Sequence, residues 1–191
     1  MHLTSGFELT TSLTNILIFL VSVYGFITIK KDKLWKLFFF LMSIDSLMGV
    51  IVHGLVMTIE LNTILWIIMA VLFTITINTF FIIFLKYKVK HIIILSILLT
   101  LFMMVLIYFD FDFILFFTLY VLLILIISFY HLIKENIKNK KYFIIGFLII
   151  LLIGGVVFTD IKLFGLNHNG FIHIILAISL IFFITGIKKN S

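Results

Sequence analysis

The sequence of 191 residues contains no cysteine, no proline and no arginine. Without cysteine, a disulfide, a thiolate metal site and a cysteine nucleophile are all excluded. Without proline, no proline-kinked helix is expected. Without arginine, a site that grips phosphate or carboxylate through a planar guanidinium is excluded, which disfavours a strongly anionic substrate.

Charged residues make up only 12% of the chain, whereas 64% of the residues are hydrophobic. Soluble domains have roughly 25% charged and about 45–50% apolar residues, so no water-soluble fold could bury this much apolar surface. The apolar runs are roughly 17–24 residues long, which matches the thickness of a bilayer core. The sequence therefore predicts an all-α polytopic membrane protein in contact with membrane lipids.

Short polar breaks divide the apolar runs, and together they predict a seven-transmembrane-helix bundle that forms a single membrane domain over residues 1–191. The helices are expected at roughly 13–29, 36–57, 62–85, 91–109, 113–133, 142–158 and 170–187. Trp35 and Trp66 lie near the ends of the second and third runs, a position typical of an interfacial aromatic belt.

The formal net charge is +6, and the basic residues are lysines placed between the apolar runs, so no nucleic-acid partner is expected. Lysines follow the first, third, fifth and seventh runs, and Lys162 alone falls on the other side. The protein is expected in the cell membrane, which is the inner membrane where there are two. By the positive-inside rule, its C-terminus is cytoplasmic and its N-terminus lies on the outer side. The lysine-rich composition hints at an AT-rich bacterial genome.

Asp45 is the clearest candidate for a functional residue, because an acid at the centre of a membrane helix costs roughly 2.5–3.5 kcal/mol on insertion scales. It lies midway along the second apolar run, and His53 follows eight residues later. With Gly49 between them, the three residues share one face of the helix.

A second polar motif, Asn-His-Asn-Gly-Phe-Ile-His, opens the seventh run and contains His168 and His173. The second helix runs outward and the seventh begins outside, so His53 and His173 are expected at similar depth. Three imidazoles with an open fourth position and a nearby carboxylate are the parts of a catalytic zinc site. The sequence therefore predicts Zn²⁺ bound by His53, His168 and His173, with Asp45 orienting an imidazole or accepting the proton of the bound water.

This pattern resembles that of the CREST superfamily of membrane hydrolases. The shared features are seven helices, an outward N-terminus, a histidine late in the second helix and histidines at the start of the seventh. That superfamily includes the alkaline ceramidases and the progestin and adipoQ receptors. The resemblance implies zinc ligands at His53 and at His173, and a reaction that cleaves a lipid amide or a related bond near the outer membrane face. It also implies an acid near the third helix, for which Glu60 is the nearest candidate, so that Asp45 or Glu60 would handle the proton.

Two other functions stay open on the sequence alone. Asp45 and His53 suit a polar path through a small transporter or channel, a common use of intramembrane acids, although no inverted repeat is visible. The chain also suits a non-catalytic membrane subunit. In that case the histidines would be packing residues that form hydrogen bonds between helices, as Thr74, Thr76 and Asn78 are expected to do.

Overall fold

The computed structural model describes residues 8–85, 94, 97, 101, 113–156 and 166–190. These residues contain six helices that can be bounded: α1 (Leu9–Thr28), α2 (Lys33–Gly54), α3 (Ile59–Leu85), α5 (Phe113–Lys134), α6 (Lys140–Val156) and α7 (His168–Asn190). Each corresponds to a helix expected from the sequence. The helix expected at 91–109 lies outside the described residues, except for 94, 97 and 101, which are helical.

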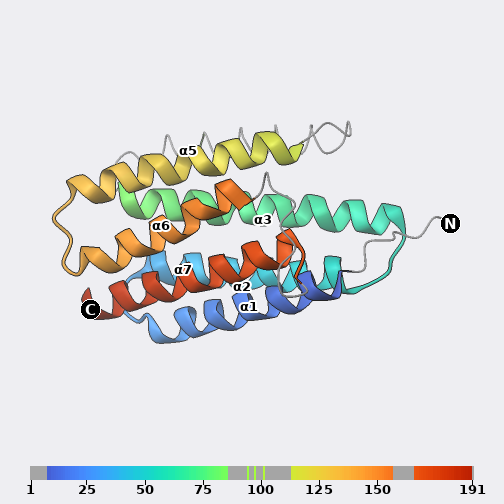
Figure 1. Ribbon diagram of the computed structural model, residues 1–191, viewed down its shortest axis with the longest axis horizontal. Helices are drawn as coiled ribbons and strands as arrows, with labels where there is room; N and C mark the ends of the chain where they lie inside the picture. The colour runs from blue at the N-terminus through green and yellow to red at the C-terminus, as the bar shows by residue number, and fades with distance from the viewer. Residues whose placement is uncertain are drawn as a thin grey trace.

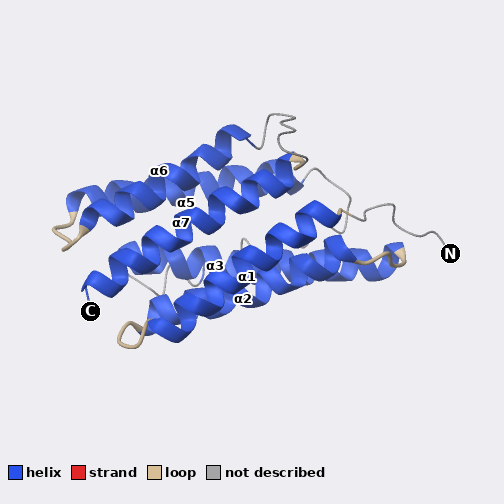
Figure 2. Ribbon diagram, turned by 60° about the horizontal axis from the view of Figure 1, so that its bottom comes forward, coloured by secondary structure: helices blue, strands red, loops and turns tan. Residues whose placement is uncertain are grey.

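The six described helices run side by side along one long axis (Figure 1). Helix α1 packs against α2 and α7, α2 against α3, α3 against α5, α5 against α6, and α6 against α7. These contacts close a ring, and a second view shows the same neighbours (Figure 2). Side chains from several helices therefore meet in the middle of the bundle.

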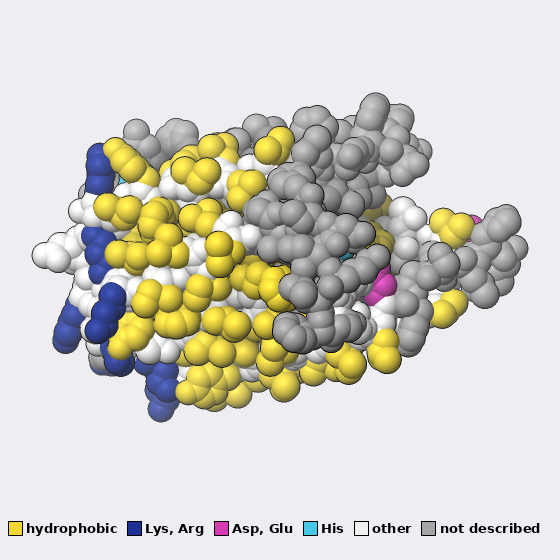
Figure 3. All heavy atoms as spheres, viewed as in Figure 1, with side chains coloured by type: hydrophobic (Ala, Val, Ile, Leu, Met, Phe, Trp, Pro, Cys, Tyr) yellow, Lys and Arg dark blue, Asp and Glu magenta, His cyan; other side chains and the backbone are white. Residues whose placement is uncertain are grey.

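Four of the described helices, α1, α2, α3 and α7, are long and apolar enough to cross a membrane. Large apolar side chains are exposed along the bundle, with Leu20 57%, Ile27 65% and Leu152 62% exposed. Figure 3 shows hydrophobic side chains over the middle of the visible face, with lysines gathered at one end. A surface of this kind is stable only in contact with lipid, as expected for a membrane protein.

Helix α1 is polar on the side that faces the bundle. Thr11, Ser12, Thr14 and Asn15 are all buried, whereas Leu13 on the same turns is 55% exposed. In a hydrocarbon solvent a polar side chain needs a protein partner, so the polar stripe of α1 turns inward and its leucines turn to the lipid. This rotation directs hydroxyl and amide groups into the interior.

Polar residues just before α2 and α7 define where these helices begin. The side chain of Asp32 accepts hydrogen bonds from the backbone N–H groups of Leu34 and Trp35, at 3.1 and 3.2 Å. The side chain of Asn167 accepts one from the N–H of Gly170 at 2.9 Å. These N-caps satisfy donors that the first turn of a helix leaves unpaired.

Towards the lysine-bearing end, aromatic rings fill the middle of the bundle. Trp35 is only 4% exposed. It contacts the rings of Phe38, Phe39, Phe80, Phe84, Phe143 and Phe183. Trp35 lies in the first turn of α2, but its ring does not form a lipid-facing belt: it points between the helices, where the phenylalanines form a closely packed cluster around it.

Helices α3 and α5 are joined by a polar contact within the apolar interior. The hydroxyl of Tyr120 donates to Oδ1 of Asn78 at 2.5 Å, and the amide of Asn78 donates to the carbonyl of Thr74 at 2.7 Å. Asn78 therefore links neighbouring helices, as the sequence predicts.

At Gly25 helix α1 packs closely on α2, and a substitution there tests how close this packing is. A Cβ added there would lie 2.7 Å from the ring of Phe39, which is fully buried and stacks on Trp35. Because this ring cannot move aside, we expect Gly25→Ala to lower the free energy of unfolding by about 1–3 kcal/mol. Thermal unfolding in mild detergent measures the change. The lipid-facing Ile27→Ala is the control, and equal stability of the two variants would contradict close packing.

Candidate functional site

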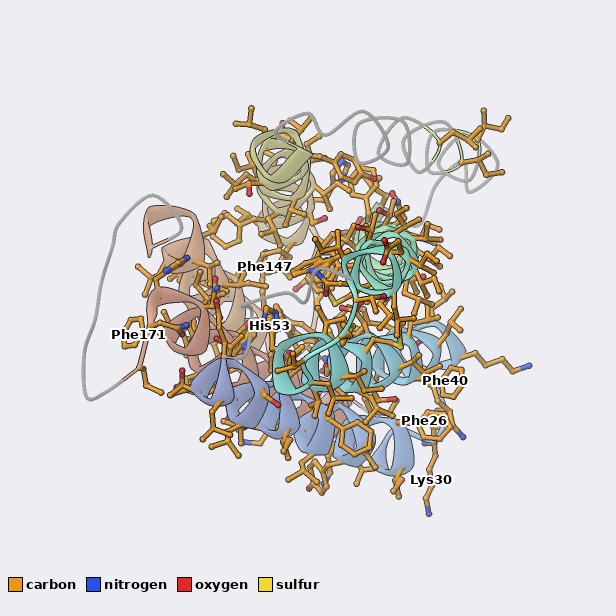
Figure 4. The ribbon with its side chains drawn as sticks, turned by 90° about the vertical axis from the view of Figure 1, so that its right-hand side faces the viewer. Phe26, Lys30, Phe40, His53, Phe147 and Phe171 are labelled. Atoms are coloured by element: carbon orange, nitrogen blue, oxygen red, sulfur yellow. The ribbon has the colours of Figure 1, made fainter. Side chains whose placement is uncertain are left out.

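A polar cavity of about 510 Å³ lies at the end of the bundle opposite the lysines. Its polar wall combines the start of α1, the second half of α2 and the start of α7, with these residues: Glu8, Asn15, Asp45, Ser46, His53, His168, Asn169 and His173. Figure 4 looks along the bundle from this end and shows His53 among the helix ends. The polar motifs of the second and seventh predicted helices therefore share one cavity.

Glu8 connects the three helix ends around this cavity. Its Oε2 accepts hydrogen bonds from the hydroxyl of Thr11 at 2.6 Å and from the amides of Asn167 at 3.0 Å and Asn169 at 3.4 Å. Its backbone N–H donates to the carbonyl of His53 at 2.9 Å. One residue thus ties the start of α1 to the end of α2 and the start of α7.

The Glu8 carboxylate also faces the His53 imidazole, with 3.8 Å between Oε2 and Nδ1. Negative charge at this position favours a proton on Nδ1, which leaves the lone pair on Nε2. The His53 ring is fixed from another side by Trp66, whose ring meets it edge to face at 5.6 Å between centroids. Trp66 accordingly lines the cavity and does not act only as an interfacial anchor.

Partial burial raises the pKa of Glu8, but other interactions outweigh this effect. The hydrogen bonds from Thr11, Asn169 and Asn167 and the nearby His53 lower it, and the net pKa lies below its ordinary value of 4.5. Glu8 is therefore ionised at neutral pH and provides a fixed negative charge at the mouth of the cavity.

His173 is oriented by α1. Its Nδ1 lies 3.1 Å from the hydroxyl oxygen of Thr14. That hydroxyl also lies 3.0 Å from the backbone carbonyls of Thr10 and Thr11, to which it can only donate. With its hydrogen used there, the hydroxyl accepts from Nδ1–H of His173, so the Nε2 lone pair is again the free one.

Asp45 lies deeper along α2, two turns from His53. It is 8% exposed, and its Oδ1 has no hydrogen-bond partner in the part of the chain that the structure describes. It lines the same cavity as the two histidines. The sequence prediction that Asp45 belongs to the polar site is therefore consistent with its position.

Of the other two predicted site residues, His168 lines the cavity and Glu60 does not. His168, the first residue of α7, is half-buried and lines the cavity. Glu60 lies in the first turn of α3, is exposed and does not line it. The acid beside His53 is Glu8 and not Glu60, because α1 returns its N-terminal end to the end of α2 while α3 starts on the outer surface.

The predicted zinc ligands share a cavity but do not form a metal site as they are placed. Among the described residues, no three His, Asp or Glu side chains lie close enough together to hold a metal ion. His173 also directs Nδ1 to Thr14. The imidazoles and the Glu8 carboxylate are the reactive groups that the cavity brings together, and zinc stays a prediction of the sequence.

A second, apolar cavity of about 220 Å³ lies beside the polar one, in the middle of the ring of helices. Both cavities are lined by His173, Met42, Phe73, Thr118, Ile172 and Leu176. The apolar cavity continues down to Phe80 and Phe183, which belong to the aromatic cluster around Trp35. A ligand with a polar group and an apolar chain would find matching surroundings in the two spaces.

Glu8, Thr14 and Asn15 are functional candidates that sequence reasoning missed. Glu8 lies outside both polar motifs and before the first expected helix at 13–29. The available signal was the spacing of polar residues at positions 8, 11, 12, 14 and 15, which places them on neighbouring turns of an otherwise apolar helix.

Fold and site together define an α-helical bundle of membrane-spanning type with a polar cavity enclosed at one end. The chain belongs to a family of unknown function (DUF6962), whose family model matches residues 10–191. No curated protein and no solved structure matches it. The resemblance to the CREST superfamily therefore rests on the residues named above.

The Glu8 network makes a prediction for stability against pH. Because the fold lowers the pKa of Glu8, the ionised carboxylate stabilises the protein above the ordinary value of 4.5, and this contribution is lost as the pH falls below it. We expect Glu8→Gln to lower the melting temperature at neutral pH and to reduce its decline in acid. Thermal unfolding over a pH series measures both effects.

The exposed Glu60→Gln is the matched control, because it removes an acid from the same end of the bundle without touching the cavity. Its melting curve should follow the wild type throughout. If Glu8→Gln also followed the wild type at every pH, the carboxylate would not hold the three helix ends together.

Proposed function

We propose that this protein is an integral-membrane hydrolase that cleaves an amide or ester bond of a lipid. The observation that carries the proposal is the shared wall between the polar cavity of Glu8, His53 and His173 and the apolar cavity beneath it. A lipid needs both surroundings: imidazoles and water at the bond to be cleaved, and an apolar space for its chain.

In the proposed reaction His53 acts as the general base. Its Nε2 carries the free lone pair, and Glu8 stabilises the imidazolium that forms when His53 takes a proton from the attacking water. The proton is returned to the leaving group of the lipid as the bond breaks. The amides of Asn167 and Asn169 hold the carboxylate in place, so Glu8 acts as a positioning residue.

His173 lies where the polar and apolar cavities meet. With Nδ1–H engaged by Thr14, its Nε2 is available to the reacting end of the substrate. A single acyl chain extending from this point would lie among Phe73, Leu176 and the residues below them. The apolar cavity therefore supports a lipid substrate over a small polar one.

Transport through the bundle has less support. The polar wall ends near Asp45, and the rings of Trp35 and its phenylalanines lie between it and a further cavity of about 660 Å³ at the lysine-bearing end, which Lys31 and Asp32 help to line. A polar path would have to cross this cluster. The arrangement favours a site open to one side of the membrane.

To test the reaction, we would purify the protein in lipid nanodiscs and supply long-chain amides and esters that release a fluorophore. We expect turnover by the wild type and a loss of roughly 10²–10⁴-fold in His53→Ala and His173→Ala, the usual contribution of general acid–base catalysis. Glu60→Gln should keep full activity, because it lies outside the cavity.

Metal content of the same samples tests the zinc prediction. Stoichiometric zinc in the wild type that disappears in His53→Ala and His173→Ala would establish both histidines as ligands. Turnover by zinc-free protein would instead leave His53 as the base. No turnover of any long-chain amide or ester by well-folded protein, with or without added zinc, would overturn the hydrolase proposal.

We further propose that the chain crosses the membrane seven times, with its N-terminus outside. Helix α3 ends near the lysine-bearing end, and α5 begins near the opposite end, which supports one more crossing between Leu85 and Phe113 (Figure 1). The lysines at 30–36, 134–141 and 188–189 all lie on the proposed cytoplasmic side.

Reporter fusions test this topology. A fluorescent protein that folds only in the cytoplasm should light up when joined after Ser191, and a phosphatase active only outside should be active when joined before Met1. The opposite pattern would show that the cavity faces the cytoplasm, and matching compartments for the two ends would exclude an odd number of crossings.

A further inference from the structure

Asp45 is not explained by the proposed hydrolysis. It lies on the floor of the polar cavity, 8% exposed, and its Oδ1 meets no hydrogen-bond donor among the described residues. Its neighbour Ser43 uses its hydroxyl to donate to the carbonyl of Phe40. A carboxylate buried among apolar helices is costly unless a positive charge accompanies it.

Asn15 offers a second oxygen on the wall of the same cavity. Its amide Nδ2 donates to the carbonyl of Thr11 at 3.2 Å, which turns Oδ1 away from α1. The amide lies flat against Gly49, since a Cβ there would be 2.8 Å from Oδ1 and 2.9 Å from Nδ2. Gly49 is one turn beyond Asp45 on the same face of α2, so the two oxygens share one corner of the cavity.

Ser46 supplies a third oxygen on the same wall. It is 4% exposed, lines the cavity and donates its hydrogen to the carbonyl of Met42 at 2.6 Å. Its lone pairs are therefore the part of the hydroxyl that can face a ligand. This part of the wall therefore offers a carboxylate, an amide oxygen and a hydroxyl oxygen as acceptors.

We propose that Asp45, Asn15 and Ser46 bind a sodium ion at the floor of the polar cavity. Carboxylate, amide and hydroxyl oxygens are the ligands that a hard cation takes. A single carboxylate balances one positive charge, and because no three acidic or histidine side chains cluster among the described residues, a divalent ion would lack neutralising charge there. Gly49 is part of the site because only a residue without Cβ lets Asn15 approach α2.

A bound sodium ion would also connect α1 to α2 below the Glu8 network. It would stabilise the folded protein by mass action, by an amount that rises with the logarithm of the free sodium concentration once this exceeds Kd. The site is distinct from the imidazoles, so sodium dependence of stability does not require hydrolase activity.

The experiment uses the full chain in detergent or nanodiscs and measures the melting temperature in a sodium chloride series. Choline chloride at equal ionic strength separates specific binding from screening. We expect sodium to raise the melting temperature of the wild type by several degrees and choline to leave it unchanged. Asp45→Asn, which keeps the shape and removes the charge, should abolish the sodium-dependent shift.

Gly49→Ala tests the geometry without touching Asp45, because the added methyl group displaces the Asn15 amide. It should weaken the response to sodium, so that a higher concentration is needed for half of the shift. Ser43→Ala is the matched control: Ser43 is buried beside Asp45 but does not line the cavity, and its variant should respond like the wild type.

Direct binding is read from the line width of the ²³Na resonance, which bound sodium broadens in the wild type and not in Asp45→Asn. Equal responses to sodium and choline, or a sodium response retained in Asp45→Asn, would overturn the proposal. An Asp45→Asn variant that is as stable as the sodium-loaded wild type in every salt would show that Asp45 carries a proton and no metal ion.

Discussion

The polar end of this bundle depends on the hydrogen bonds that the carboxylate of Glu8 accepts. The helices expose apolar side chains to lipid, so their polar ends must be satisfied by one another, and Glu8 does this for three of them. Through Thr11, Asn167 and Asn169 it joins α1 to α7, and through its backbone and its charge it joins both to the end of α2. His53 is positioned as a consequence.

The two ends of the bundle are built on opposite principles. At the lysine-bearing end, Trp35 and the phenylalanines around it pack ring against ring between the helices. At the other end, short polar side chains of α1 and α7 surround a cavity. Close packing resists deformation, whereas a polar cavity holds water and ligands, so the aromatic cluster supports the site without taking part in its chemistry.

The polar groups of the cavity also separate into two levels along α2. His53, beside Glu8, lies near the helix end. Asp45 lies two turns deeper, next to Ser46 and one turn from Gly49, against which Asn15 packs. The upper level has imidazole lone pairs suited to proton transfer, and the lower level has oxygen acceptors suited to a cation. The separation arises because Asp45 and His53 are eight residues apart on one face of α2, so they lie at different heights along the helix axis.

The sequence by itself determined where the described helices lie, which end bears the lysines and which polar side chains occur within apolar runs, because these properties depend on hydrophobicity summed along a segment. Tertiary structure alone decided that Glu8, and not Glu60, faces His53, that Trp35 points inward, and that Asn15 lies against Gly49. A helix that is apolar all round has little periodicity to indicate which face turns inward, so its rotation is set by its neighbours.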